Sequence, residues 1–293
     1  MSSPRPTVSV VVATLRRPHL LRHTLRTLVR TTPPPDEILV VDGDDEHSAR
    51  APADEVRAIA GPIPIHYVEG PQGLTRQRNV GVTRATGDVV VFVDDDVALE
   101  PDAFARVREA YADPGVVGVT AQIVEPETRS FGRFRSPIRR LLGREGTFTR
   151  FGYPRYPLQV ERETDIEFMF GCFMSGRRDA VVEVGFDEEL PGYALAEDQD
   201  FSFRLSRRGR LRYVPQIVCY HRRQGFDNRD RRAFDRNLVA TRAYLMRKNF
   251  QPNALAWAEF TLFVSALLAH RLLNREYEGA RGLVEGMARI VRR

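Results

Sequence analysis

Short apolar runs alternate with longer amphipathic segments along the first 125 residues of the chain. Residues 89–93 are five apolar residues in a row, which is typical of a strand buried on both faces. Leu21, Leu25 and Leu28 have helical spacing. We predict strands at 7–14, 36–42, 63–69, 88–94 and 115–124, and helices at 18–31, about 53–59, 74–86 and 101–113. This alternation predicts an α/β fold with a mostly parallel sheet flanked by helices.

The rest of the chain is less regular. Residues 129–150 contain seven arginines and one acid among scattered apolar side chains, as expected of a flexible or interfacial insertion. Residues 196–209 predict a helix with acids at its start, and residues 211–221 predict a pair of strands. From about residue 230 the pattern is helical. We therefore divide the chain into residues 1–125, 126–225 with the basic insertion, and a helical C-terminal extension at 226–293.

Composition narrows the class of protein only a little. The 293 residues are 42% hydrophobic and 28% charged, which is ordinary for a soluble globular protein. A net charge of +5 permits nucleic-acid, membrane or anionic partners without choosing among them. The arginine-rich stretch contains no recognised nucleic-acid module, so we expect no nucleic-acid partner. Two cysteines, Cys172 and Cys219, exclude a disulfide framework and favour a reducing, cytoplasmic compartment.

Three aspartates, Asp94, Asp95 and Asp96, follow the apolar run at 89–93. A single aspartate there would be an ordinary turn residue, but three adjacent like charges repel one another. Because side chains alternate along an extended chain, Asp94 and Asp96 point one way and Asp95 the other. Carboxylate oxygens are the ligands that hard divalent ions prefer. The pattern favours a metal that carries a diphosphate.

Thr14, Asp42 and Asp94 each end a predicted strand. Ligands of parallel sheets bind outside the carboxyl ends of the strands, so we expect these three residues to meet in one crevice. The first strand continues into TLRRPHLL, which contains no glycine. This excludes the glycine-rich loops of dinucleotide-binding and P-loop proteins.

Several ordered segments of the chain resemble family 2 glycosyltransferases of the GT-A fold. VSVVVATLRRPHLLRHTLRTL resembles the opening strand and helix, EILVVDGDD the nucleoside-contacting strand, and GLTRQRNVGVTRATGDVVVFVDDD the Arg-Asn helix with its D-x-D strand. GCFMSGRRDAVVEVGFDEEL resembles the acceptor-side loop, and AEDQDFSFRL resembles the E-D motif. The resemblance runs from Val8 to about His221. It implies an inverting transferase that moves a sugar from a nucleoside-diphosphate donor to the hydroxyl of a glycan, a lipid-linked acceptor or a small molecule.

The resemblance also implies roles for individual residues. On the donor side, the nucleotide-sugar contacts would be Thr14, Arg16, Asp42, Arg78, Asp94 and Asp95. Asp96 would bind Mn²⁺ or Mg²⁺, and His221 matches a second metal ligand of some relatives. Asp198 would be the catalytic base, with Gly171, Glu197 and Asp200 on the acceptor side. The sequence departs from the family in VDGDD, and in Leu15 and Arg16, which replace an aromatic residue and an asparagine.

Simpler interpretations stay open for these residues. Asp42 is also compatible with a turn, Arg78 with a solvated helix, and the acids at 197–200 with a helix start. His221 is equally compatible with a histidine that binds no metal. Two other functions remain as alternatives: a nucleotide-sugar-binding protein without turnover, and a nucleotidyltransferase.

Two segments raise the hypothesis of a peripheral contact with the inner face of a membrane. Residues 133–144 place five arginines among apolar residues without an acid, and residues 254–269 are almost wholly apolar. The second segment is short for a membrane span and is interrupted by Glu259. The alternative is a core helix that packs on the catalytic domain.

Overall fold

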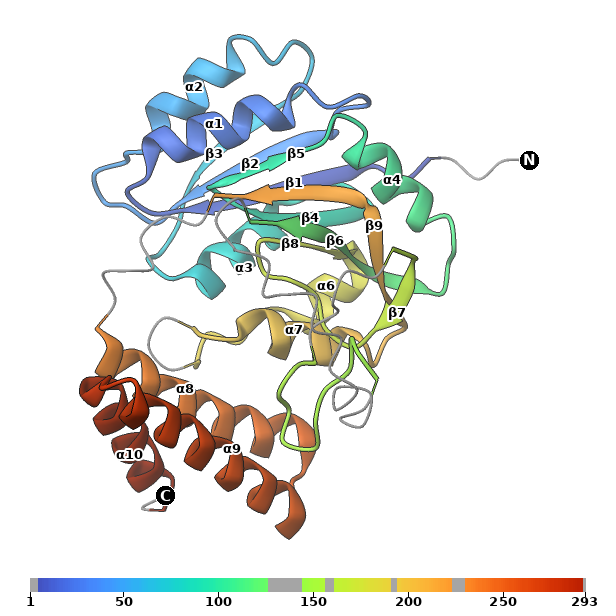
Figure 1. Ribbon diagram of the computed structural model, residues 1–293. Coiled ribbons are helices and arrows are strands. Elements are labelled where there is room, and N and C mark those ends of the chain that lie inside the picture. Colours follow the sequence, from blue (N-terminus) through green and yellow to red (C-terminus); the bar gives the residue numbers. More distant parts are fainter. Residues whose placement is uncertain (1–4, 126–143, 156–160, 191–193, 223–229, 292–293) are drawn as a thin grey trace.

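A computed structural model of the chain describes residues 5–125, 144–155, 161–190, 194–222 and 230–291. Its described residues contain one nine-stranded sheet in the order β3-β2-β1-β4-β8-β6-β9-β5, with β7 paired to β9 (Figure 1). The strands are β1 Val8–Thr14, β2 Glu37–Asp42, β3 Ile65–Glu69, β4 Val89–Asp94, β5 Val97–Leu99, β6 Val116–Val124, β7 Thr164–Ile166, β8 Phe173–Arg177 and β9 Arg210–His221.

The first half of the chain follows the predicted alternation. Strands β3, β2, β1 and β4 are parallel neighbours. The helices are α1 Pro18–Leu28, α2 Arg50–Arg57, α3 Leu74–Arg84 and α4 Ala103–Ala110. Alternate strand residues enter two cores: Val10 and Val12 pack with α1, α2 and α4, while Val11 packs with α3. The predicted strands and helices of this half all form within a few residues of the expected bounds.

The second half of the sheet is mixed. Strand β8, which the apolar pattern did not predict, lies antiparallel between β4 and β6. The expected pair of strands at 211–221 is wrong, because β9 is one strand with a bend. Its register on β6 shifts between Val214 and Val218. Pro215 lies at this shift, where a missing backbone N–H breaks the ladder.

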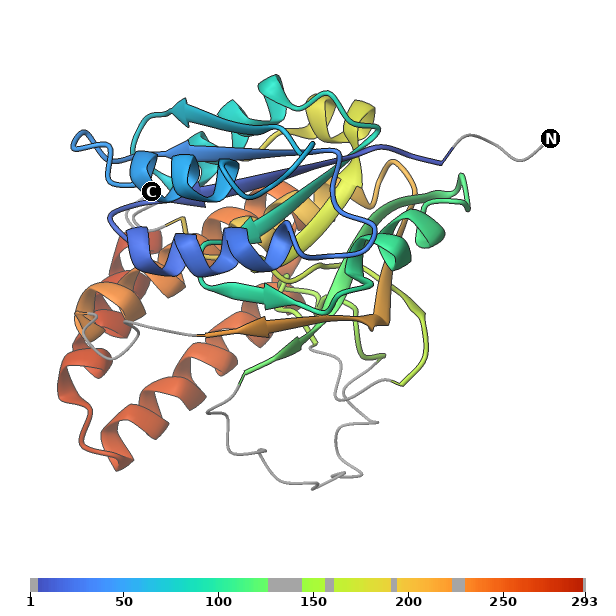
Figure 2. The ribbon, with the colours of Figure 1, turned by 90° about the horizontal axis from the view of Figure 1, so that it is seen from above.

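The helices of the C-terminal half pack below the sheet. They are α6 Arg178–Val184, α7 Glu197–Leu205, α8 Arg231–Leu245, the π-helical turn η1 Met246–Phe250, α9 Ala254–Leu273 and α10 Tyr277–Val291. The last three α-helices lie beneath α7 in Figure 1, and in Figure 2 they again lie next to one another, in orange and red. They share a small core with Phe151 that includes Val239, Phe260 and Leu283. The arginine-rich insertion, up to residue 143, lies outside the described residues.

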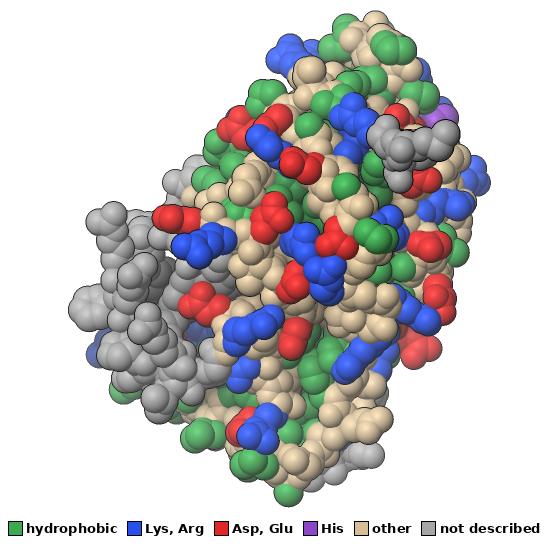
Figure 3. Space-filling view, turned by 90° about the vertical axis from the view of Figure 1, so that its right-hand side faces the viewer, with side chains coloured by type: hydrophobic (Ala, Val, Ile, Leu, Met, Phe, Trp, Pro, Cys, Tyr) green, Lys and Arg blue, Asp and Glu red, His purple; other side chains and the backbone are tan. Residues whose placement is uncertain are grey.

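Among the described helices, α9 alone is long and apolar enough to cross a membrane by length and composition. Only 17% of its apolar window is buried. One side of α9 packs in the small core through Phe260 and Val264, as the core-helix alternative expects, and most of the remaining apolar window is not buried. On another face of the molecule, shown in Figure 3, acidic and basic side chains are interspersed. The described side chains of that face therefore form no single-sign patch for a polyanion.

Candidate active site

The three aspartates that follow β4 have different partners. Asp95 accepts a hydrogen bond of 2.6 Å from the Thr14 hydroxyl and one of 3.3 Å from Arg17 Nη1. Asp94 accepts a bond of 3.0 Å from Arg78 Nη2. One ligand atom from each of Asp94, Asp96 and His221 lies within 4.8 Å of the others. Asp94 and Asp96 thus gather with His221 at the end of β9, whereas Asp95 faces β1 and α1.

This group of two carboxylates and an imidazole fits a divalent metal ion. Oδ1 of Asp96 is buried, and it has no hydrogen bond of acceptable geometry. It lies 3.2 Å from His221 Nε2. Burial alone would lower the pKa of His221, but the Asp96 carboxylate outweighs it and raises this pKa to about 9. Carboxylate oxygens and a neutral imidazole are ligands that Mn²⁺ accepts, so these three side chains fit the ion, whose binding would release the proton of His221.

Arg78 joins the metal group to the E-D motif. Its side chain is 2% exposed, and Nη1 donates a 2.8 Å hydrogen bond to Glu197 Oε1. Nη2 donates to Asp94, and to the carbonyl oxygen of Gly171 at 2.8 Å. Burial raises the pKa of Asp94 to about 6, against the opposing charge of Arg78, and the charge of Asp96 adds to the rise. Arg78 is therefore the buried cation of the site and not a solvated helix residue.

Asp198 occupies the first turn of α7. Its Oδ2 accepts a hydrogen bond of 3.2 Å from the backbone N–H of Gly171, and Oδ1 accepts one of 2.8 Å from Gln199 N. Burial, with a further contribution from the charge of Glu197, raises the pKa of Asp198 to about 7. A carboxylate of this pKa is suited to accept a proton near neutral pH.

At the end of β2, both oxygens of Asp42 already have donors from the protein. Oδ1 accepts from Asp44 N, and Oδ2 accepts from Ala49 N, each at 3.0 Å. The Tyr67 hydroxyl also donates to Oδ2, at 3.1 Å. Asp42 thus holds the loop that follows β2, as its turn interpretation requires. Arg16 extends to the same loop and pairs with Asp44 at 3.0 Å.

The structure brings together most of the predicted site residues. Those around the metal group and the E-D motif are Thr14, Arg78, Asp94, Asp95, Asp96, Gly171, Glu197, Asp198 and His221. Asp42 and Arg16 lie at the neighbouring strand end. Asp200 does not join them. Its carboxylate is fully buried and binds Arg204, Lys248 and Asn249, which gives no support to an acceptor-side role.

Sequence reasoning missed Arg17. Its Nη1 lies 3.3 Å from Asp95 Oδ1 and 3.4 Å from Asp96 Oδ2. The side chain is 39% exposed, so it stands at the open side of the carboxylates. The signal was a second arginine directly before Pro18, where α1 begins at the carboxyl end of β1.

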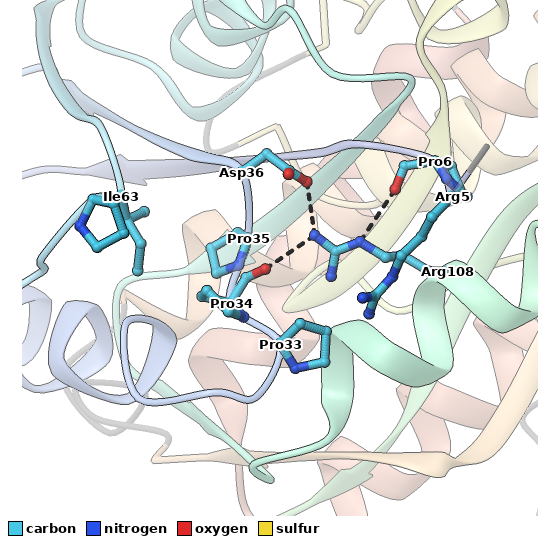
Figure 4. A pocket seen from close by; sticks show the side chains of 9 residues that line it. Arg5, Pro6, Pro33, Pro34, Pro35, Asp36, Ile63 and Arg108 are labelled. Atoms are coloured by element: carbon cyan, nitrogen blue, oxygen red, sulfur yellow. Dashed lines mark hydrogen bonds and ion pairs between the residues drawn. The ribbon is translucent and has the colours of Figure 1, made fainter.

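A separate cavity of about 310 Å³ lies at the amino ends of β1 and β2, away from these residues (Figure 4). Prolines form much of its wall, and the guanidinium of Arg108 donates to Pro6 O, Pro34 O and Asp36. Because ligands of such sheets bind at the carboxyl ends of the strands, we assign the site to the aspartate edge.

Comparison with known proteins agrees with this assignment. The sequence profile described as glycosyl transferase family 2 matches residues 9–185. The chain is 30% identical over 199 residues to the succinoglycan biosynthesis protein ExoM of Rhizobium meliloti (strain 1021), covering 66% of this chain and 59% of that protein. It is 34% identical over 232 residues to validoxylamine A glucosyltransferase of Streptomyces hygroscopicus subsp. limoneus, covering 73% and 50%. The chain thus spans less than two thirds of either relative.

Solved structures share the fold at low sequence identity. Mannosyltransferase PcManGT from Pyrobaculum calidifontis, in complex with GDP-Man and Mn²⁺, has a TM-score of 0.64 at 16% identity, covering 99% of this chain and 88% of that one. GalNAc-T7 with UDP, GalNAc and Mn²⁺ has a TM-score of 0.60 at 15% identity, covering 81% and 48%. These likenesses establish the GT-A fold, as the sequence predicted.

Proposed function

The chain belongs to glycosyl transferase family 2, and from that premise we propose a metal-dependent, inverting transfer of a sugar from a nucleoside-diphosphate donor to an acceptor hydroxyl. The observation that carries the proposal is the group of Asp94, Asp96 and His221, connected through Arg78 to Glu197 beside Asp198. The Mn²⁺ and nucleotide complexes of proteins with this fold support it. In this scheme residues 1–125 bind the donor, and residues 126–225 bind the acceptor.

Each part of the chemistry has a group to perform it. A divalent ion held by Asp94, Asp96 and His221 would supply positive charge to the departing diphosphate. Asp198 accepts the proton of the acceptor hydroxyl as its oxygen bonds to the anomeric carbon. The bond from that carbon to the diphosphate oxygen breaks, and the nucleoside diphosphate leaves. One displacement of this kind inverts the anomeric configuration and needs no carboxylate nucleophile. Arg78 compensates the charge of Glu197 and Asp94 and keeps both in place.

The first test is binding. Thermal shift with UDP, GDP and dTDP, with and without Mn²⁺, reports ligands that bind only the folded protein. We expect one nucleotide to raise the melting temperature, and to do so only with the metal. If no nucleotide shifts it under either condition, the proposal is wrong.

The second test is turnover. With the selected nucleotide as sugar donor, we expect slow donor hydrolysis or transfer by the native protein. Asp198→Asn should keep the thermal shift and lose about 10²–10⁴-fold in rate. Asp179→Asn, at an exposed acid of α6, is the matched control. Binding without turnover would identify a nucleotide-sugar-binding protein, and pyrophosphate release from a nucleoside triphosphate with a sugar phosphate would identify a nucleotidyltransferase.

We also propose that α9 rests on an anionic lipid surface. Leu255, Leu262 and Leu273 are 50%, 71% and 84% exposed, and the acid of the helix, Glu259, pairs with Arg150 at 3.3 Å. Residues 230–293 hold twelve Lys and Arg against six Asp and Glu, a net +6 in a chain of net +5. The excess positive charge of the chain therefore lies in the same region as the apolar helix α9. An exposed apolar face with basic residues nearby is the combination that binds anionic membrane surfaces. The free cysteines, Cys172 and Cys219, support the cytoplasmic side.

Vesicle sedimentation tests this surface. We expect the protein to sediment with phosphatidylglycerol vesicles at low salt, less at high salt, and not with phosphatidylcholine. Leu262→Gln with Leu273→Gln should weaken the association, whereas Val182→Gln, at a 54% exposed residue of α6, should not. Absence from the anionic pellet would refute the proposal. A dimer in solution that the leucine changes dissociate would instead assign the face to a second copy of the chain.

A further inference from the structure

The first four residues of α7 face two different parts of the molecule. Glu197 and Asp198 contact Arg78 and Gly171 at the site. Gln199 Oε1 instead accepts a hydrogen bond of 2.5 Å from Arg242 of α8. The next carboxylate, Asp200, is the fully buried group bound by residues of η1. One helix start therefore presents the proposed catalytic pair on one side and two anchoring side chains on the other.

The turn before α7 has an unusual backbone. Ala194 and Ala196 have φ angles of 52° and 67°, a region that side chains other than glycine rarely adopt. Such conformations persist only where their surroundings hold them. Here the two alanines pack with Leu190 and with Leu245, the last residue of α8, and Tyr244 lies against the same group. The C-terminal helices thus cover the turn that sets the direction of Glu197 and Asp198.

Lys248, the single lysine of the chain, bridges the segments on either side of this turn. Its Nζ lies 2.5 Å from Asp187 Oδ2 and 3.0 Å from Asp200 Oδ1. Asn249 Nδ2 donates to the same oxygen, at 2.9 Å from Asp200 Oδ1, and Lys248 Nζ also lies 3.1 Å from Asp200 Oδ2. Both residues belong to η1, and π-helical turns of this kind are frequent at functional sites.

We propose that Lys248 and Asn249 are positioning residues for Asp198. They hold α7 through the carboxylate of Asp200. This contact keeps Asp198 at the N–H of Gly171 and Glu197 at Arg78. This inference rests on the proposed role of Asp198 as the base. The donor site should not depend on it, because Asp94, Asp96 and His221 come from the ends of β4 and β9.

Steady-state kinetics of Lys248→Met test the proposal. A displacement of a catalytic group by about 1 Å can cost 10²-fold in rate, so we expect kcat to fall by at least tenfold. The KM of the donor and the Mn²⁺-dependent nucleotide affinity should stay within about twofold. Lys248→Arg keeps the positive charge, so we expect it to retain a higher kcat than Lys248→Met. Arg232→Met removes an exposed ion pair with Glu285, between α8 and α10, and is the matched control.

Asn249→Ala provides a milder second variant, since it removes one hydrogen bond and no charge. Here we expect a smaller loss of kcat at unchanged nucleotide affinity. Unchanged kcat in both variants, with only a lower melting temperature, would overturn the proposal and leave these contacts a stabilising role. Equal losses of kcat and nucleotide affinity would also overturn it. Full activity of Asp198→Asn is a separate result, which refutes the role of Asp198 itself.

Discussion

The guanidinium of Arg78 donates a 2.8 Å hydrogen bond to the carboxylate of Glu197, 119 positions later in the chain. The same guanidinium binds Asp94 at the end of β4. One buried cation therefore connects the edge of the sheet where a donor would bind to the helix that carries the proposed base. We therefore expect a substitution of Arg78 to change both the stability of the folded protein and its affinity for the nucleotide.

Arg78→Met should destabilise the fold strongly. Removing one partner of a buried ion pair typically costs about 3–5 kcal/mol, because the remaining charges lose their compensation. Arg78→Lys keeps the charge but not the planar fork, so we expect an intermediate loss. Urea denaturation measures the difference. Arg106→Met, which breaks an exposed pair with Asp102, should cost far less, because water screens the exposed charges. Equal costs for Arg78→Met and Arg106→Met would contradict this account.

Asp96 and Asp95 should differ in their effect on metal binding. Asp96→Asn removes a member of the metal group and should abolish Mn²⁺-dependent nucleotide binding in calorimetry. Asp95→Asn should be milder, because Asp95 binds Thr14 and Arg17 and lies outside that group. Equal and unimpaired binding in the two variants would show that the aspartates do not hold a metal.

Much of the first half of the fold was predictable, because β1, β2 and β4 are short apolar runs that read as buried strands. Strand β8 was not, since FMSGR is only partly apolar and its place between β4 and β6 depends on pairing with both. Asp94 and Asp96 could be identified from their position after a buried strand. Their gathering with His221 depends on β9, which the sequence pattern divided in two.

The sequence did not predict which side chains of α7 face the site and which face the C-terminal helices. Acids at 197, 198 and 200 all suit a helix start, and their pattern does not say which of them face the sheet. The structure turns Asp200 toward Lys248, because the C-terminal helices pack on that side. Arg17 was missed for a related reason. An arginine before a helix is commonly solvated, and only the fold places it over Asp95.

The rate of transfer should depend on pH through Asp198. Its pKa rises from the usual 3.8 to about 7, and only the deprotonated form accepts a proton. We therefore expect kcat to increase as the pH rises toward 7 and to level off above it. Because the folded state holds this proton more tightly than the unfolded chain, the group contributes stability below its unfolded pKa. That contribution is lost as the pH rises through about 7. A kcat profile already level at pH 5 would contradict the assignment.

Gly171→Ala should reduce turnover while sparing the fold. The backbone of Gly171 binds Asp198 through its N–H and Arg78 through its carbonyl. An added Cβ would lie 3.1 Å from Glu197 Oε1, so the Glu197 side chain must shift by a few tenths of an ångström, and it would touch the Cβ of Asp198 at 3.4 Å. We expect a loss of kcat with a small change in melting temperature, because the contacts are with side-chain atoms rather than backbone. Gly61→Ala, where the Cβ meets nothing within 4 Å but φ is +63°, is the control for glycine replacement itself. If Gly171→Ala keeps native kcat, the positions of Glu197 and Asp198 do not depend on this close approach of the backbone.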